Sequence, residues 1–353
     1  MNKYSELPIN NINFKEKKIL LAHSNQGDAM DAWHERRRVS AVEMGYNLSL
    51  FKMSDFHPYT IFPYLEKKWK KRDPVLMKFY EKLGEAIDEC DIFIHYNGAL
   101  IHPEFLEQFK KIKIYHCADD PDASAVISKP VALYYDVCAI SNPACIDMYR
   151  KWGCKQVFFW PLGALHFEDQ FNNLDFLDKD LERDIPILFI GSKLGVTNIR
   201  FIGNFLGLYR KKGFMKKLEN TFPELLAYGS GWARGRVADE LVNDLYRRSK
   251  IGINIHNSLG PINGRLYDLA AFGVCQICDN KKSLNSVFVE GKEIIGFQTD
   301  KECFELLRYF LNHPEEAIEI GRAGQQRFLK DYTMSAIWSG FFENLGKSIL
   351  PNL

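Results

Sequence analysis

The stretch IGINIHNSLGPINGRLYDLAAFGVCQICD, residues 251–279, carries the clearest pattern of alternating strands and helices in the chain. A short apolar run ends at His256, and a helix is predicted over 263–272. Gly273 stops this helix, and a second apolar run follows at once. Two apolar runs joined by one amphipathic helix predict a β–α–β unit with parallel strands.

The same alternation extends in both directions along the chain. Further strands are predicted at 17–23, 47–52, 91–96, 112–117, 136–141, 155–160, 185–191, 225–229 and 293–298. Further helices are predicted at 28–45, 74–89, 103–110, 142–152, 197–212, 236–249, 300–312 and 314–330, and around Trp338. Strands and helices in alternation predict an α/β fold with parallel sheets covered by helices on both faces.

The polar segment 161–184 interrupts this rhythm and is interpreted as an inter-domain connection. The sequence therefore predicts two Rossmann-like, doubly wound domains, at 1–165 and 166–330. A terminal helix within 331–353 is expected to pack back toward the first domain.

Composition excludes several classes of protein. The 353 residues hold 46 Lys and Arg against 45 Asp and Glu, and both halves are close to neutral, so bulk charge does not recruit a polyanion. No apolar run is long enough to span a membrane, and residues 1–16 do not resemble an export signal. The eight cysteines mostly lie in apolar runs, as is typical of reduced thiols in a cytoplasmic protein, and the lone pair Cys275 and Cys278 is not expected to bind metal.

The helix that opens at Asn263 is a candidate anion site. Its free backbone N–H groups, its dipole, the flexible Gly264 and the Arg265 guanidinium can converge on one phosphate group. Asp268 lies one turn further and could accept from two ribose hydroxyls. An equally open alternative is that Arg265 and Asp268 only pair with each other.

Two further segments are candidates for contact with a bound ligand. The first is a turn after the strand at 185–191, with Gly191, Ser192 and Lys193, followed by a helix that carries Arg200. The second is YGSGW at 228–232, in which Gly229 allows close approach of the backbone to a planar ligand. The alternatives are a solvated lysine in the first segment and an ordinary turn in the second.

In this order, the segments resemble the C-terminal half of the spore-maturation (CgeB-like) family of GT-B glycosyltransferases, within the wider group 1 glycosyl transferases. The resemblance rests on the strand with Gly-Ser at 190–192, on YGSGW, on DLYRRSKIGINIH at 244–256, on NGRLYDLAAFG at 263–273, and on the closing stretch 291–333. In the N-terminal half, only the rhythm and HCADDP at 116–121 match.

The resemblance implies a GT-B fold, with a nucleotide-sugar donor in the C-terminal domain and an acceptor in the N-terminal one. UDP-sugars are the favoured donors, and no cofactor or metal is expected. The residues that would hold the donor are Gly191, Ser192, Lys193, Arg200, Tyr228, Gly229, His256, Asn263, Gly264, Arg265 and Asp268. One departure is that Gly260 stands where related retaining enzymes carry the first acid of an E-x7-E pair, which leaves the stereochemical outcome open.

Catalysis is expected to rest on charge and on a base near the acceptor. Arg265 would stabilise the charge that builds on the leaving diphosphate. His116, Asp119 and Asp120 are the preferred candidates on the acceptor side, because they lie at the end of a strand of the N-terminal domain. Other candidate bases at strand ends are His23, Asp28 and His95.

The sequence leaves three classes of acceptor: a glycan, a protein and DNA. The segment KKWKKR at 67–72 places cations around Trp69, a pattern that can grip a nucleic-acid backbone and stack a base. A second alternative is a catalytically silent module that only binds a nucleotide sugar.

Overall fold

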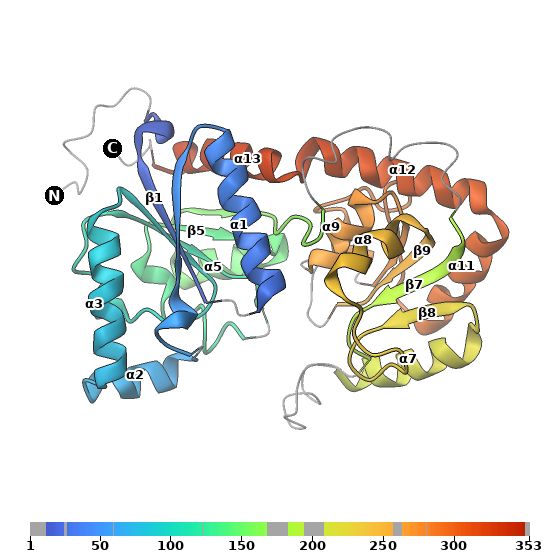
Figure 1. Cartoon of the computed structure of the whole chain (residues 1–353), viewed down its shortest axis with the longest axis horizontal. Coiled ribbons are helices and arrows are strands. Elements are labelled where there is room, and N and C mark those ends of the chain that lie inside the picture. Colours follow the sequence, from blue (N-terminus) through green and yellow to red (C-terminus); the bar gives the residue numbers. More distant parts are fainter. Residues whose placement is uncertain are drawn as a thin grey trace. The chain divides into compact units, whose positions relative to one another are not determined.

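The computed structural model describes residues 12–24, 27–58, 60–121, 123–167, 183–193, 208–256, 263–279 and 281–349, with the backbone alone for 208–212. It divides into two compact units (Figure 1). Unit 1 comprises Met1–Pro161 with Met334–Leu353, and unit 2 comprises Leu162–Thr333. Within the described residues, no helix combines the length and the apolar character needed to cross a bilayer.

Unit 1 is built on a parallel sheet in the order β2-β1-β3-β4-β5-β6. Its strands are β1 (Lys18–His23), β2 (Asn47–Lys52), β3 (Ile92–Tyr96), β4 (Ile112–His116), β5 (Val137–Ile140) and β6 (Val157–Phe159). Every residue of β3 and β5 is buried, as expected for strands covered on both faces. The chain reverses its direction of travel across the sheet between β1 and β3, which is where such sheets bind ligands.

Unit 1 contains helices with and without a side-chain N-cap. They are α1 (Asp28–Glu43), α2 (Phe62–Lys70), α3 (Pro74–Asp88), α4 (Pro103–Leu106), α5 (Ile146–Trp152) and α13 (Met334–Ile349). The Asp73 side chain accepts from the Leu76 N–H and starts α3, with Pro74 in the first turn. α2 was not predicted, because only Leu65 and Trp69 of this short, cation-rich helix are buried.

The C-terminal helix α13 packs beside α1 (Figure 1). The Trp338 indole donates a 2.8 Å hydrogen bond to the Arg37 carbonyl oxygen. The fully buried Arg37 guanidinium lies between 4.4 and 5.5 Å from the ring centroids of Trp33, Tyr96, Trp160 and Trp338. This aromatic enclosure joins the last helix to the first one.

Unit 2 has its own parallel sheet, in the order β11-β10-β9-β7-β8. The strands are β7 (Ile185–Ile190), β8 (Leu225–Tyr228), β9 (Ser249–Asn254), β10 (Cys275–Cys278) and β11 (Ile295–Gly296). β7 lies between β8 and β9, so the direction of winding reverses between β7 and β9. The carboxyl ends of these two strands mark the expected ligand position.

The helices of unit 2 include one close backbone contact. They are α7 (Leu208–Thr221), α8 (Asp239–Arg247), α9 (Gly264–Ala271), α10 (Lys281–Leu284), α11 (Asp300–Asn312) and α12 (Pro314–Asp331). A β-carbon at Gly321 of α12 would lie 2.2 Å from the Gly273 carbonyl oxygen, so α12 can approach the end of α9 only with glycine there. α10 was not predicted, and most of the predicted helix 197–212 lies outside the described residues.

Candidate functional site

The donor-site candidates of unit 2 gather at one edge of its sheet. Gly191 follows β7, Gly229 follows β8, His256 follows β9 and Asp279 follows β10. All four strands are parallel, so these residues share the carboxyl edge. α9 begins at this edge as well, and the Asn263 side chain caps it by accepting from the Leu266 N–H at 2.9 Å.

Arg265 reaches from the first turn of α9 to the point where the winding reverses. Its Nη1 lies 3.3 Å from Asn254 Oδ1 and 3.4 Å from the Ile255 carbonyl oxygen, at the end of β9. Its guanidinium carbon lies 4.8 Å from the ring centroid of Phe189 in β7. Burial lowers the pKa of Arg265, but arginine keeps its proton in proteins, so a permanent cation stands at the switch point.

Gly191 is the residue that gives Arg265 this position. A β-carbon at 191 would lie 2.2 Å from Arg265 Nη2 and 3.1 Å from its guanidinium carbon. Only glycine allows the cation to lie against the backbone at the end of β7. The structure therefore brings together the two predicted donor segments that contain Gly191 and Arg265.

The YGSGW loop packs on the same turn. A β-carbon at Gly229, whose φ is +130°, would lie 2.2 Å from the Gly191 carbonyl oxygen. Trp232 Nε1 donates to that oxygen at 2.9 Å. The close backbone approach predicted for Gly229 is thus made to the chain itself and not to a planar ligand, while the half-buried Tyr228 ends β8.

Ser192 and Lys193, the other described residues of the first donor loop, are half-buried. Lys193 Nζ pairs with Glu219 and lies 4.6 Å from the centroid of the Trp232 ring, so it is not a freely solvated loop cation. Ser192 is half-buried beside it. Arg200 lies outside the described residues.

An amide network that the sequence analysis missed fixes the start of α9. Asn263 Nδ2 donates to Asn254 Oδ1 at 2.7 Å, and Asn254 Nδ2 donates to Gln276 Oε1 at 2.8 Å. Gln276 Nε2 in turn donates to the Leu266 carbonyl oxygen. Alternate polar residues inside the apolar runs INIH and CQIC were the available signal.

Gly264 has a packing role. A β-carbon there would lie 2.4 Å from Leu165 Cγ, so the residue is small to admit Leu165 and not to admit a phosphate.

Asp268 departs from its predicted role. The residue is 1% exposed. Its Oδ1 accepts from the backbone N–H groups of Leu165 and His166 at 2.8 and 2.9 Å, and its Oδ2 lies 3.0 Å from His166 Nδ1. With both oxygens occupied and no exposed surface, this carboxylate holds the 165–166 segment, and it presents nothing to ribose hydroxyls.

His256 and Asp279 form a pair at the ends of β9 and β10. The Asp279 carboxylate accepts from the His256 backbone N–H at 3.1 Å and lies 2.6 Å from His256 Nδ1. Cys278 Sγ lies 3.9 Å from the same nitrogen. His256 Nε2 is buried and has no hydrogen-bond partner among the residues that the structure describes.

Within the described part of the chain, His256, Cys278 and Asp279 are the side chains that could surround a metal ion. Their ligand atoms lie within 4.8 Å of one another. The 2.6 Å separation of His256 Nδ1 and Asp279 Oδ1 is a hydrogen-bond distance. Burial raises the pKa of the Cys278 thiol well above its ordinary value, which disfavours the thiolate that binds metals. The arrangement fits a hydrogen-bonded pair better than a metal centre.

The acceptor-side candidates of unit 1 are mostly inside the protein. His116 is fully buried, stacked on Tyr96 with 4.0 Å between ring centroids, and burial lowers its pKa well below the ordinary value. Asp120 is buried too and accepts from Ser128 Oγ at 2.8 Å and from the Tyr149 hydroxyl at 2.5 Å. His116 and Asp120 therefore belong to the core of unit 1, in contrast to the prediction that they contact the acceptor.

Asp119 and the other candidate bases differ in exposure. Asp119 is exposed and accepts from Asn97 Nδ2 at 2.9 Å. His95 is fully buried against the Tyr135 hydroxyl, whereas Asp28 is exposed at the start of α1.

His23 lines a pocket at the carboxyl ends of β1 and β2. The pocket measures about 420 Å³, and its other lining residues include Asp31, Glu35 and Lys52. Burial lowers the pKa of His23 to about 4, so its imidazole is neutral at pH 7. Lys52 Nζ pairs with Asp31 at 2.7 Å on the pocket wall.

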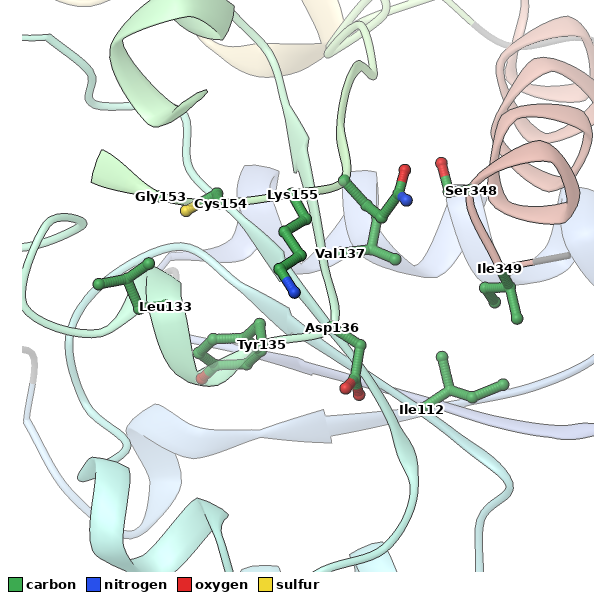
Figure 2. A pocket seen from close by; sticks show the side chains of 11 residues that line it. Ile112, Leu133, Tyr135, Asp136, Val137, Gly153, Cys154, Lys155, Ser348 and Ile349 are labelled. Atoms are coloured by element: carbon green, nitrogen blue, oxygen red, sulfur yellow. The ribbon is translucent and has the colours of Figure 1, made fainter. Parts of the chain in front are cut away.

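A second pocket of unit 1, of about 300 Å³, lies at the opposite edge of the same sheet (Figure 2). Asp136 and Lys155 line it beside the first residues of β4 and β5, and Ser348 and Ile349 of α13 complete it. Ligands of parallel sheets bind at carboxyl ends, so this amino-edge pocket is not the candidate acceptor site.

The basic segment 67–72 does not offer a stacking surface. Trp69 is 8% exposed, stacks on His102 with 4.6 Å between centroids, and donates from Nε1 to Glu104 at 3.0 Å. Lys70 pairs with Glu66. The prediction that Trp69 stacks a base is therefore wrong, because the indole belongs to the core.

Comparison with known proteins agrees with this architecture. Residues 210–342 match a family model described as glycosyl transferase-like. No curated protein sequence matches the chain.

Solved structures of similar fold span nearly the whole chain. The structure of HepE from Anabaena in complex with UDP has a TM-score of 0.57 at 10% identity, over 94% of this chain and 100% of that chain. Sucrose-phosphate synthase from Thermosynechococcus elongatus has a TM-score of 0.60 at 13% identity, over 94% and 100%. An α-glucosyltransferase in complex with UDP and a 13-mer DNA has a TM-score of 0.59 at 11% identity, over 93% and 99%.

The predicted fold class is confirmed. The chain has the GT-B fold, and its residues 210–342 match the glycosyl transferase-like model, so the two comparisons agree on a glycosyltransferase.

Proposed function

We propose that the chain transfers a sugar from a nucleoside-diphosphate sugar to an acceptor hydroxyl, with the donor at the carboxyl edge of the unit 2 sheet. The observation that carries the proposal is the Arg265 guanidinium at the β7–β9 switch point, which only a glycine at 191 accommodates. A UDP-sugar is the preferred donor, because the similar structure of HepE was solved with UDP and with UDP-glucose.

Arg265 supplies what the reaction needs on the donor side. The bond between the anomeric carbon and the diphosphate oxygen breaks, and its electron pair stays on the departing diphosphate. A cation held in a partly desolvated position stabilises that charge more strongly than it would in water. The first turn of α9 lies beside Arg265, and the partial positive charge of its free backbone N–H groups adds to that of the guanidinium.

On the acceptor side, the pocket at β1 and β2 is the proposed binding place in unit 1. If the anomeric configuration is inverted, His23 would take the proton of the acceptor hydroxyl, although burial, which lowers its pKa to about 4, makes it a weak base for that step. If configuration is retained, a phosphate oxygen of the donor takes that proton and His23 only orients the acceptor. A glycan or a protein side chain is the proposed acceptor, since Trp69 is not available to stack a base.

Membership of the CgeB-like subgroup, metal independence and a cytoplasmic location belong to the same proposal. Supporting the location, all eight cysteines are buried and none is in a disulfide. Independence of metal is supported by Arg265, which supplies the positive charge that a metal would otherwise bring.

Thermal-shift measurements with UDP, GDP, CDP and CMP, followed by hydrolysis assays with the corresponding sugar nucleotides and EDTA, test the proposal. We expect one nucleoside diphosphate to raise the melting temperature and its sugar nucleotide to be hydrolysed slowly without an acceptor. Binding without any hydrolysis would instead support a silent binding module. DNA binding that weakens with salt would revive the DNA acceptor.

A further inference from the structure

The His256–Asp279 pair has a feature that packing alone does not explain. Asp279 engages both the backbone N–H and the Nδ1 atom of His256, so one carboxylate fixes the position and the tilt of the imidazole. The opposite ring nitrogen, Nε2, is buried with no hydrogen-bond partner among the described residues. A buried polar atom of this kind costs stability unless something else satisfies it.

The pair also stands next to the proposed phosphate site. His256 follows Ile255 directly, and the carbonyl oxygen of Ile255 is a contact of Arg265 Nη1 at 3.4 Å. The pair and Arg265 thus share the carboxyl end of β9, where the donor is proposed to bind.

The contact with Asp279 fixes which nitrogen of the neutral His256 ring carries the hydrogen. A carboxylate accepts, so Nδ1 carries a hydrogen, and Nε2 is left as the atom that meets a ligand. When the ring is protonated, Nε2 carries a hydrogen too, and Asp279 balances the charge. An imidazolium held in this way can donate a strong hydrogen bond to a phosphate oxygen.

We infer that His256, positioned by Asp279, donates from Nε2 to the diphosphate of the donor, beside Arg265. This inference rests on the proposed function and adds a second group for the leaving diphosphate. The step is a hydrogen bond only: the electron pair of the broken bond stays on the diphosphate, and the proton stays on His256. Asp279 acts through the imidazole and is a positioning residue.

Two substitutions at 256 separate the two ring nitrogens. The amide nitrogen of Asn in His256→Asn can stand near the place of Nδ1 and keep the contact with Asp279, but it leaves the Nε2 position empty. His256→Gln can place its amide nitrogen near Nε2. Calorimetry with UDP and with uridine, which lacks the diphosphate, then shows which nitrogen the ligand uses.

We expect His256→Asn to weaken UDP binding about tenfold or more and to leave uridine binding within about twofold, as for loss of one charge-assisted hydrogen bond. His256→Gln should recover part of the UDP affinity. Asp279→Asn should weaken UDP binding and alter the histidine tautomer seen by ¹⁵N NMR, because the carboxylate that fixes Nδ1–H is gone. His313→Asn, at an exposed histidine between α11 and α12, is the matched control and should change neither affinity.

Equal losses for UDP and uridine, or unchanged UDP affinity in His256→Asn, would overturn the inference. So would stoichiometric zinc that disappears in Cys278→Ser, since the ring nitrogen would then be a metal ligand. If UDP does not bind the wild type but GDP does, the same comparison uses GDP and guanosine. A wild type that binds no nucleoside diphosphate refutes the proposed function itself, which is a different result.

Discussion

The guanidinium of Arg265 occupies the space that a side chain at residue 191 would need. The distance from Nη2 to an ideal β-carbon at Gly191 is 2.2 Å, well inside van der Waals contact. The glycine after β7 and the arginine in α9 thus depend on each other, although they lie far apart along the chain.

Gly191→Ala should reduce nucleotide affinity with little loss of fold. The new methyl group displaces the flexible end of Arg265, so we expect UDP binding to weaken about tenfold and stability to fall by about 1–3 kcal/mol. Calorimetry and urea denaturation measure the two effects. Gly213→Ala in α7 is the control, because a β-carbon there meets nothing within 4 Å and should leave affinity unchanged.

Arg265→Ala should lower the rate of sugar transfer or donor hydrolysis by about 10²–10³-fold, the cost of one preorganised charge at a developing anion. Arg265→Lys keeps the charge but loses the planar fork that contacts Asn254 and Ile255, so it should recover only part of the rate. Rates measured at saturating donor give the comparison. A rate for Arg265→Ala within threefold of wild type would remove Arg265 from the site.

The fold could be predicted from the sequence because the spacing of apolar residues differs between strands and helices. The strand ends at His23 and Tyr96 follow from such runs, whereas β9 ends at Asn254, two residues before the predicted end at His256. Contacts between residues that are distant in sequence could not be predicted in this way. Asp268 illustrates the limit: its spacing from Arg265 indicated a shared helix face, but its hydrogen bonds go to Leu165 and His166.

The predictions that His116 and Asp120 contact the acceptor were wrong for a related reason. A polar residue at the end of a parallel strand can face either the ligand edge or the interior, and the strand pattern is the same in both cases. His116 and Asp120 face the interior, while Asp119 between them is exposed. Conversely, Asn254 and Gln276 were overlooked because they lie inside apolar runs.

Asp268→Asn should destabilise the protein instead of weakening nucleotide binding. The carboxylate holds two backbone N–H groups and His166, and an amide keeps one acceptor oxygen only, so we expect a loss of about 2–4 kcal/mol in unfolding free energy. Urea denaturation measures the loss, and calorimetry well below the melting temperature measures affinity. Asp244→Asn, at an exposed pair with Arg248, should cost less than about 1 kcal/mol. A selective fall in nucleotide affinity without a loss of stability would restore the ribose role.

Acid should destabilise unit 1 through its buried imidazoles. Burial lowers the pKa of His23 to about 4 and that of His95 to about 3, and it lowers the pKa of His34 well below its ordinary value. A histidine pKa that is lower in the folded state means that the unfolded chain binds protons more readily below pH 6.5. Stability should therefore fall as the pH drops from about 6.5 toward 4, with uptake of protons on unfolding.

His34→Phe tests this directly, because neither ring nitrogen of His34 has a hydrogen-bond partner among the described residues. Its ring stacks on His23 with 3.9 Å between centroids and meets Trp33 and Tyr96 edge to face, contacts that a phenyl ring can keep. We expect the variant to lose less stability than wild type between pH 6.5 and 4, as measured by urea denaturation at several pH values. His313→Phe, at an exposed position, should leave the pH profile unchanged. A wild-type stability that is flat across this range would contradict the burial of neutral histidines in unit 1.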